Sequence, residues 1–164
     1  MKWLLREIHK KLKLFFSYFR IFIFRYNSAK KRIHMDGVWI HGADFTKLKI
    51  EKNVWINNAF LDLHNTISIE EDVTFGHKVK ILTGTHNIYK FGKERAAVIS
   101  KPVVIKRGAW IASYAIVLPG TIIGEYAVVA AGSVVRGEVP PYALMAGNPA
   151  KQIASIPENM GIQK

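Results

Sequence analysis

Aliphatic residues recur at every sixth position through the carboxyl-terminal half of the chain. The series is Ile105, Ile111, Val117, Ile123, Val129 and Val135. Small residues stand four positions after each of the first five members: Ala109, Ala115, Thr121, Ala127 and Ser133. Neither an α-helix, with a period of about 3.6, nor an alternating strand, with a period of 2, gives this spacing. The repeat therefore predicts short strands stacked in coils, with inward aliphatic side chains packing from coil to coil.

The same period extends toward the amino terminus. In-phase residues are Ile81, Phe75, Ile69 and Leu63, and the matching inward positions are Val79, Val73 and Ile67. Further upstream, Ile50 and Ile56 keep the six-residue step and are followed by inward Val54 and Phe60, but their phase is offset by one. One extra residue therefore lies around Leu61–Asp62, where we expect a bulge that re-aims a side chain.

The pattern is interrupted between Ile81 and Ile105 and then resumes in the same phase. This predicts an excursion loop at about residues 86–102, and long excursions from a rigid scaffold often carry function. The segment GEVPPYALMAGNPAKQIASIPE is rich in proline and glycine and should form a cap. We expect an all-β parallel β-helix of triangular section at residues 37–155, followed by a tail at 156–164.

Residues 1–36 have a different pattern and form a separate amino-terminal segment. Apolar side chains including Leu5, Phe16 and Phe19 fall on one stripe of a helical wheel, and basic ones including Lys10 and Arg20 fall on the other. This predicts a basic amphipathic helix, too interrupted by arginine to span a bilayer and lacking a signal-peptide cleavage site. Two interpretations stay open: residues 1–28 bind a membrane surface, or the helix packs on the protein.

Charge and cysteine content narrow the function classes. The net charge is +12, and residues 1–36 contribute +8 of it, from ten lysines and arginines against two acidic residues. The remaining chain is only mildly basic and lacks a nucleic-acid-binding motif, so we expect no nucleic-acid partner. The chain contains no cysteine, which excludes a disulfide framework and is compatible with the cytoplasm.

The repeats, the excursion after TGTH and the ending AGSVVRGEVPPYALMAGNPAKQI together resemble the hexapeptide-repeat acyltransferases of the left-handed β-helix superfamily. The similarity is greatest to maltose, galactoside and colanic acid O-acetyltransferases. It implies a left-handed prism, a homotrimer with sites between adjacent prisms, and acetyl-CoA as co-substrate with no metal ion. It also implies a saccharide acceptor. The chain begins with a basic, aromatic segment where maltose-type enzymes begin with a polar one, and this difference favours an acceptor in surface-polysaccharide or lipid-linked glycan synthesis, carried out by a cytoplasmic protein held at the inner membrane face.

The resemblance assigns roles to particular residues. His86, in a T-x-x-H context at the root of the excursion, matches the catalytic histidine, and a neutral imidazole can accept a proton from an attacking alcohol. Asp62 matches an acidic position near the acceptor or the catalytic histidine. Asn58 matches an asparagine of the acceptor site, although Asn57 is also eligible. Asp62 and Asn58 could instead serve turn geometry. The predicted cofactor contacts are Ser113, Ala131, Arg136, Lys151 and Trp110.

Three alternatives compete with this assignment. The acceptor could be a free small sugar, or the prism could be a scaffold without chemistry. A γ-class carbonic anhydrase would share the prism and bind zinc through three histidines, but His64, His77 and His86 lack the required spacing. We expect the remaining histidines, including His41 and His64, to be surface or hydrogen-bonded residues.

Overall fold

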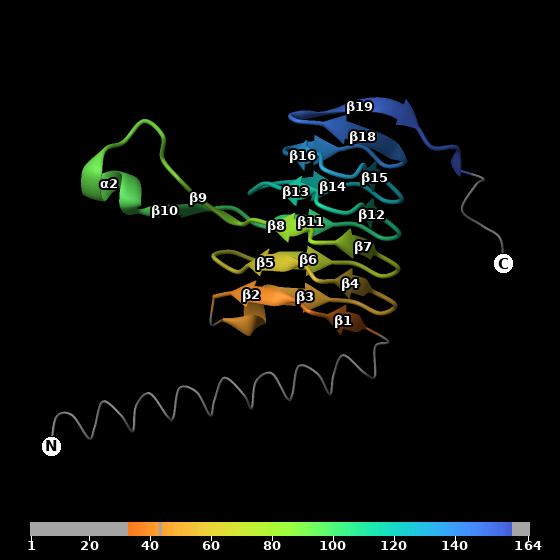
Figure 1. Cartoon of the computed structure of the whole chain (residues 1–164), viewed down its shortest axis with the longest axis horizontal. Helices are drawn as coiled ribbons and strands as arrows, with labels where there is room; N and C mark the ends of the chain where they lie inside the picture. Colours follow the sequence, from red (N-terminus) through yellow and green to blue (C-terminus); the bar gives the residue numbers. More distant parts are fainter. Residues whose placement is uncertain (1–32, 43, 159–164) are drawn as a thin grey trace, which may run out of the picture.

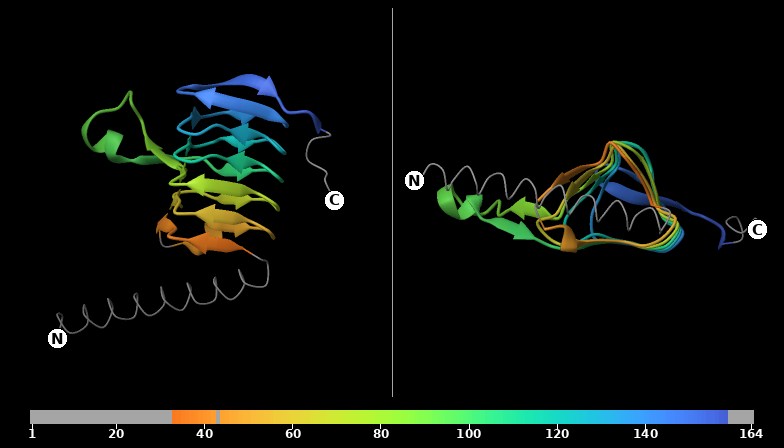
Figure 2. Two further views of the ribbon diagram at one scale, coloured as in Figure 1. Left: turned by 45° about the vertical axis from the view of Figure 1, so that its right-hand side comes forward. Right: turned by 90° about the horizontal axis from the view of Figure 1, so that it is seen from below.

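The computed structural model describes residues 33–42 and 44–158, and these form a prism of stacked coils (Figure 1). Seen along its axis, the prism is triangular and the coils superpose closely (Figure 2). The predicted left-handed parallel β-helix is confirmed. The first strand begins at His34, slightly before the expected start at residue 37. Most of the predicted amphipathic helix, residues 1–32, lies outside the described residues.

Three sheets make the three faces of the prism. Face A contains β1 (His34–Asp36), β4 (Trp55–Asn57), β7 (Thr74–His77), β12 (Trp110–Ile111), β15 (Val128–Val129), β18 (Ala143–Gly147) and β19 (Ala150–Ser155). Face B contains β2 (Trp39–His41), β5 (Phe60–Asp62), β8 (Lys80–Ile81), β13 (Ile116–Val117) and β16 (Val134–Val135). Face C contains β3 (Leu48–Ile50), β6 (Ile67–Ile69), β11 (Val103–Ile105), β14 (Ile122–Ile123) and β17 (Glu138–Val139), and the 3-10 turn η1 (Phe45–Lys47) precedes β3.

The chain passes from face A to B to C in each coil, so the prism has three edges, here called A/B, B/C and C/A. Neighbouring strands on each face are parallel, except that β18 and β19 pair antiparallel and close face A. Backbone amides of one coil donate to carbonyl groups of the next, as in the 2.9 Å bond from Trp110 to Ala127. Each coil therefore depends on its neighbours for hydrogen bonds and for packing.

The predicted inward positions form the core. Every member of the aliphatic series from Ile105 to Val135 is buried, and so is every small residue of the companion series. Small side chains fit where the chain turns from one face to the next, because the inward space narrows there. The six-residue repeat therefore predicted correctly both the buried aliphatic positions on the faces and the buried small residues at the corners.

The phase break is divided between face A and the B/C edge. On face A, Trp55 to Asn57 spans two positions of β4, whereas the paired Thr74 to His77 spans three positions of β7, so the register shifts there and the expected bulge lies on face A rather than around Leu61–Asp62. At the B/C edge, Phe60 to Ser68 spans eight positions, whereas Ile116 to Ile122 spans six. The net gain of one residue agrees with the sequence, but Phe60 turns outward instead of inward. The extra residues lengthen the turn that follows Asp62.

The excursion is an arm rather than a plain loop, and it leaves the prism at the B/C edge (Figure 1). It consists of β9 (Gly84–His86), the short helix α2 (Gly92–Ala96) and β10 (Val98–Ser100), with β9 and β10 paired antiparallel. It therefore begins and ends about two residues earlier than predicted. Its tip exposes Ile88, Tyr89 and Phe91, which are 74%, 84% and 78% accessible.

Within residues 33–42 and 44–158, no helix is long and apolar enough to cross a membrane.

One glycine of β7 is required by close backbone packing. A Cβ atom at Gly76 would lie 2.4 Å from the backbone nitrogen of Ser113 and 2.6 Å from its Oγ. Gly76→Ala should therefore destabilise the prism by about 1–3 kcal/mol, the usual cost of overpacking. Urea unfolding measures this, with Thr74→Ala, an exposed position of the same strand, as control. Equal stability of the two variants would contradict the close approach.

Candidate active site

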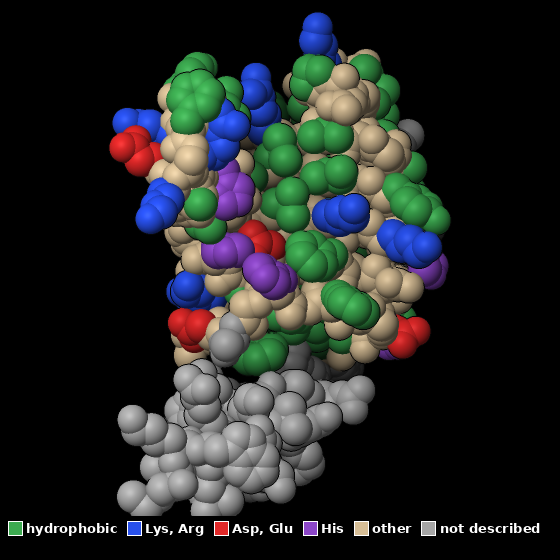
Figure 3. Space-filling view, turned by 60° about the vertical axis from the view of Figure 1, so that its left-hand side comes forward, with side chains coloured by type: hydrophobic (Ala, Val, Ile, Leu, Met, Phe, Trp, Pro, Cys, Tyr) green, Lys and Arg blue, Asp and Glu red, His purple; other side chains and the backbone are tan. Residues whose placement is uncertain are grey.

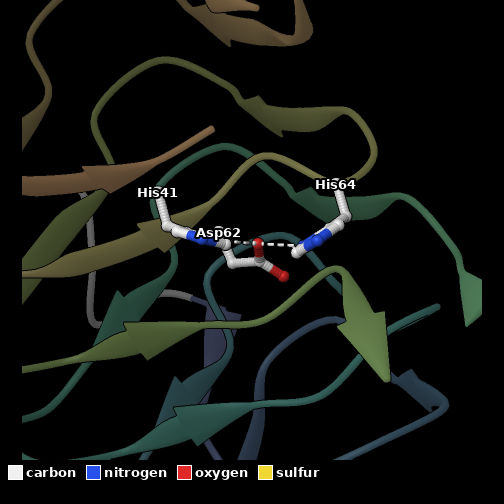
Figure 4. A group of neighbouring side chains, drawn as sticks. All are labelled: His41, Asp62 and His64. Carbon is white, nitrogen blue, oxygen red and sulfur yellow. Dashed lines mark hydrogen bonds and ion pairs between the residues drawn. The ribbon is translucent and has the colours of Figure 1, made fainter. Parts of the chain in front are cut away.

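A carboxylate and two imidazoles meet at the B/C edge (Figure 4). Asp62 ends β5, His41 ends β2 one coil earlier, and His64 lies in the lengthened turn after β5. Nδ1 of His41 lies 3.2 Å from Oδ1 of Asp62, and Nδ1 of His64 lies 2.5 Å from the same oxygen. Both histidines are exposed, whereas Asp62 is buried. The turn that carries the extra residues thus brings His64 onto Asp62.

The second oxygen of Asp62 binds the start of the arm. Oδ2 accepts hydrogen bonds from the backbone amides of Thr83 (3.1 Å) and Gly84 (2.8 Å). The Thr83 hydroxyl donates to the Asp62 carbonyl oxygen. Burial raises the pKa of Asp62, but hydrogen bonds from the two imidazoles and the two amides outweigh it, so the pKa lies below its ordinary value. A buried anion therefore fixes the arm to face B.

Further hydrogen bonds fix the other strand of the arm. The amide of Asn65 donates to the Thr83 hydroxyl (2.9 Å), and its side-chain nitrogen lies 3.2 Å from Oγ of Ser100. The amide of Lys101 donates to the Thr83 carbonyl oxygen (2.9 Å), which closes the base of the hairpin. The root of the arm is consequently held at both strands, while its tip extends away from the prism (Figure 2).

His86 lies on the same side of β9 as the imidazole and carboxylate groups. A Cβ atom at Gly84 would lie 2.8 Å from Nδ1 of His64 and 3.1 Å from Oδ2 of Asp62, so the open side of Gly84 faces them. Residues two apart in a strand point to the same side, so the exposed His86 side chain shares that side. In Figure 3, histidine side chains gather around a carboxylate beside the arm and next to apolar groups of the prism.

Asn58 does not join this group within one chain. It lies at the A/B edge, where its φ of 46° places it in a column of left-handed corner residues with Gly37, Lys78, Tyr114 and Gly132. Asparagine tolerates this conformation, which accounts for its presence there. The neighbouring Asn57 is half-buried and donates to the Phe75 carbonyl oxygen (3.3 Å). Asp62 and His86, by contrast, share the B/C edge.

The predicted cofactor residues divide among several regions. Ser113 and Ala131 lie on the A/B edge with Asn58, and the Ser113 hydroxyl accepts a hydrogen bond from the His77 amide (3.1 Å). Trp110 projects from face A and is 50% accessible. Two basic residues are exposed: Arg136 at the B/C edge and Lys151 on β19. Face B therefore separates the edge of His86 from the edge of Ser113 and Ala131.

Sequence reasoning missed His41 and His64 as members of the site. They are 21 and 2 positions from Asp62, and only the coil register brings His41 beside it, in the pair His41–Asp62 of β2 and β5. Two features of the sequence could have indicated this meeting. His41 precedes Asp62 by about one coil, and the phase break near Asp62 lengthens the turn that carries His64.

Comparison with known proteins agrees with the architecture. The family model of the bacterial transferase hexapeptide (six repeats) matches residues 102–137. The structure is similar to a maltose O-acetyltransferase from Clostridium difficile 630, with 26% identity over 77% of this chain, 66% of that chain and a TM-score of 0.68. A hexapeptide-repeat acetyltransferase from Vibrio cholerae, solved with acetyl coenzyme A, has 28% identity over 74% and 72% of the two chains and a TM-score of 0.55.

A galactoside acetyltransferase in complex with coenzyme A shares the fold, with 22% identity over 77% of this chain, 66% of that chain and a TM-score of 0.65. A search of curated protein sequences finds no match. The chain spans slightly less than two thirds of the maltose and galactoside enzymes. These findings confirm the resemblance to the hexapeptide-repeat acetyltransferases.

The Asp62 hydrogen bonds predict an acid-sensitive contribution to stability. Asp62→Asn replaces one accepting oxygen with a donor, so it should cost roughly 1–3 kcal/mol at neutral pH. Because the folded pKa is lowered, this contribution is present above the ordinary aspartate pKa of about 3.9 and is lost as pH falls through the folded value. Urea unfolding at several pH values should therefore show the gap from wild type closing in acid. Asp72→Asn, at an exposed turn, is the control; a gap that persists or widens in acid would count against the network.

Proposed function

We propose that this hexapeptide-repeat protein is an acetyltransferase that moves the acetyl group of acetyl-CoA to a saccharide hydroxyl, with His86 as the general base. The observation that carries the proposal is the fixed position of His86. It stands on β9 two residues after Gly84, whose amide is bound by the buried Asp62 carboxylate. The similarity to a maltose O-acetyltransferase and to an acetyltransferase solved with acetyl coenzyme A supports this chemistry.

The proposed reaction needs one proton acceptor and no covalent enzyme intermediate. The His86 imidazole takes the proton of the acceptor hydroxyl while that oxygen attacks the thioester carbonyl carbon. The new carbon–oxygen bond forms, the carbon–sulfur bond breaks, and the imidazolium returns its proton to the departing thiolate. The products are the acetyl ester and free coenzyme A.

Asp62 acts in this proposal as a positioning residue. Its carboxylate does not carry the proton; it holds the Thr83 and Gly84 amides and thereby fixes the strand on which His86 stands. A base must lie within hydrogen-bond reach of the hydroxyl, so a shift of the arm by about 1 Å would lower the rate strongly. Anchoring the root of the arm to the rigid prism prevents such a shift.

The proposed site is shared between copies of the chain. His86 and Asp62 lie on the B/C edge, whereas Ser113, Ala131 and Asn58 lie on the A/B edge. One prism cannot bring two of its own edges together, but the A/B edge of one copy can meet the B/C edge of the next. In a closed ring of three copies, each A/B edge meets the B/C edge of a neighbouring copy. The exposed apolar tip of the arm would then be covered, as such surfaces usually are.

Within that arrangement, acetyl-CoA would lie along the contact between two prisms. Backbone groups at Ser113 and Ala131 would bind the pantetheine arm, and Trp110 would line it. Lys151, with Arg136 as a second cation, is suited to the phosphates of CoA. The acceptor is a saccharide, in surface-polysaccharide or lipid-linked glycan synthesis, and the basic segment at residues 1–28 favours an acceptor at the inner membrane face.

Substitution of His86 tests the chemistry. His86→Ala should lower the rate of thiol release from acetyl-CoA by about 10² to 10⁴, the usual contribution of a general base, with little change in acetyl-CoA affinity. The assay uses the full chain with a panel of mono- and oligosaccharides and nucleotide sugars. His34→Ala, at an exposed histidine on the first strand of face A, is the matched control. Near-normal turnover of His86→Ala would exclude His86 as the base.

Lys151→Ala should have the opposite effect and raise the apparent KM for acetyl-CoA with little change in kcat. A phosphate contact is made equally in the ground state and the transition state, so its loss weakens binding without changing the chemical step. A drop in kcat alone would place Lys151 elsewhere in the reaction.

The shared site requires a trimer. Sedimentation of the full chain at micromolar concentration should give three times the mass of one chain. Substitution of Ile88 and Phe91 by serine should weaken the assembly, because both side chains are exposed on the arm of the single chain. A stable, active monomer would contradict a site between copies.

A further inference from the structure

We propose that His41, His64 and Asp62 form a binding site for one divalent transition-metal ion, most suited to Zn²⁺. Each residue offers one ligand atom, and the three atoms lie within 4.8 Å of one another. The two histidine ligand atoms are Nδ1, and the carboxylate ligand is Oδ1, which both imidazoles face (Figure 4). This inference departs from the expectation of no metal drawn from the sequence.

Backbone hydrogen bonds already orient the Asp62 carboxylate for binding a metal ion. Its Oδ2 accepts hydrogen bonds from the Thr83 and Gly84 amides, which restrain the carboxylate with Oδ1 directed at the two imidazoles. Outer hydrogen bonds of this kind orient metal ligands in known sites.

One pair of ligand atoms already has the spacing that a metal requires, and all three atoms lie within 4.8 Å of one another. Bonds of about 2.0–2.1 Å in a tetrahedral site place ligand atoms roughly 3.3 Å apart. The His41 Nδ1 to Asp62 Oδ1 distance is 3.2 Å. The His64 contact is shorter and must open by less than about 1 Å, a small side-chain rotation for a residue in a lengthened turn. Gly84 keeps space beside this nitrogen, because a Cβ there would lie 2.8 Å from it.

The donor set selects the class of ion. Two imidazoles and one carboxylate suit Zn²⁺, Co²⁺ or Ni²⁺, whereas Mg²⁺ and Ca²⁺ prefer oxygen ligands throughout. The side chains of His41 and His64 are 61% and 37% accessible, so an ion can enter from solvent and keep a water as its fourth ligand. Binding would link β2 to β5 and, through Asp62, to the root of the arm.

Titration of the chelator-treated full chain with Co²⁺ tests the site, because tetrahedral Co²⁺ absorbs in the visible range. We expect one ion per chain, displaced by Zn²⁺, and a rise in melting temperature with either ion. His41→Ala and His64→Ala should each weaken binding by more than the roughly 10–100-fold that loss of an outer-shell partner costs. His77→Ala, an exposed histidine on face A, should bind as wild type does.

Two results would overturn the proposal. In the first, no saturable Co²⁺ or Zn²⁺ binding occurs, and the three residues are then a hydrogen-bonded group only. In the second, His41→Ala and His64→Ala bind as tightly as wild type, and any bound ion then lies elsewhere. Circular dichroism of both variants establishes that they fold. Because these readouts need no acetyl transfer, failure here leaves the His86 assignment intact, and failure of the His86 assignment leaves the metal site intact.

Discussion

The hydrogen bonds of the buried Asp62 carboxylate are the constraint on which the site depends. Its Oδ2 accepts hydrogen bonds from two backbone amides at the start of the arm, and its Oδ1 faces the imidazoles of His41 and His64. A buried anion without these partners would be strongly destabilising, so the fold and the arm stabilise each other. These hydrogen bonds hold β9, the strand that carries His86, against the rigid stack of coils.

The prism provides that rigidity because its regular coils have little freedom. Aliphatic side chains fill the interior from Ile50 to Val139, and parallel hydrogen bonds join each coil to the next. Polar groups gather where the repeat is interrupted. The lengthened turn after β5 supplies His64 and Asn65, and the interruption after β8 supplies the arm. The regular repeats thus act as a frame, and the irregular B/C edge holds the candidate chemistry.

The sequence predicted the frame better than the site. Inward positions such as Ile111 and Ala115 followed from a period that only stacked hexads explain, and both are buried. The phase break near Asp62 is also visible in the sequence, but its division between a register shift on face A and a longer turn at the B/C edge is not, so the prediction that Phe60 points inward is wrong. The meeting of His41 with Asp62 was not predictable in this way, because it depends on how many residues each turn contains. Asn58, selected by resemblance, has a local backbone reason for its identity.

The proposed division of the site between two edges connects the fold to the chemistry. A single prism presents His86 on one edge and the Ser113 corner on another, so the account requires a neighbour to complete the site. A crystal structure of the full chain with coenzyme A tests this claim most directly. The account predicts a ring of three, with the CoA sulfur between two prisms and within roughly 4 Å of the His86 imidazole, close to hydrogen-bond reach. Coenzyme A bound to one prism alone, or with its sulfur far from His86, would contradict it.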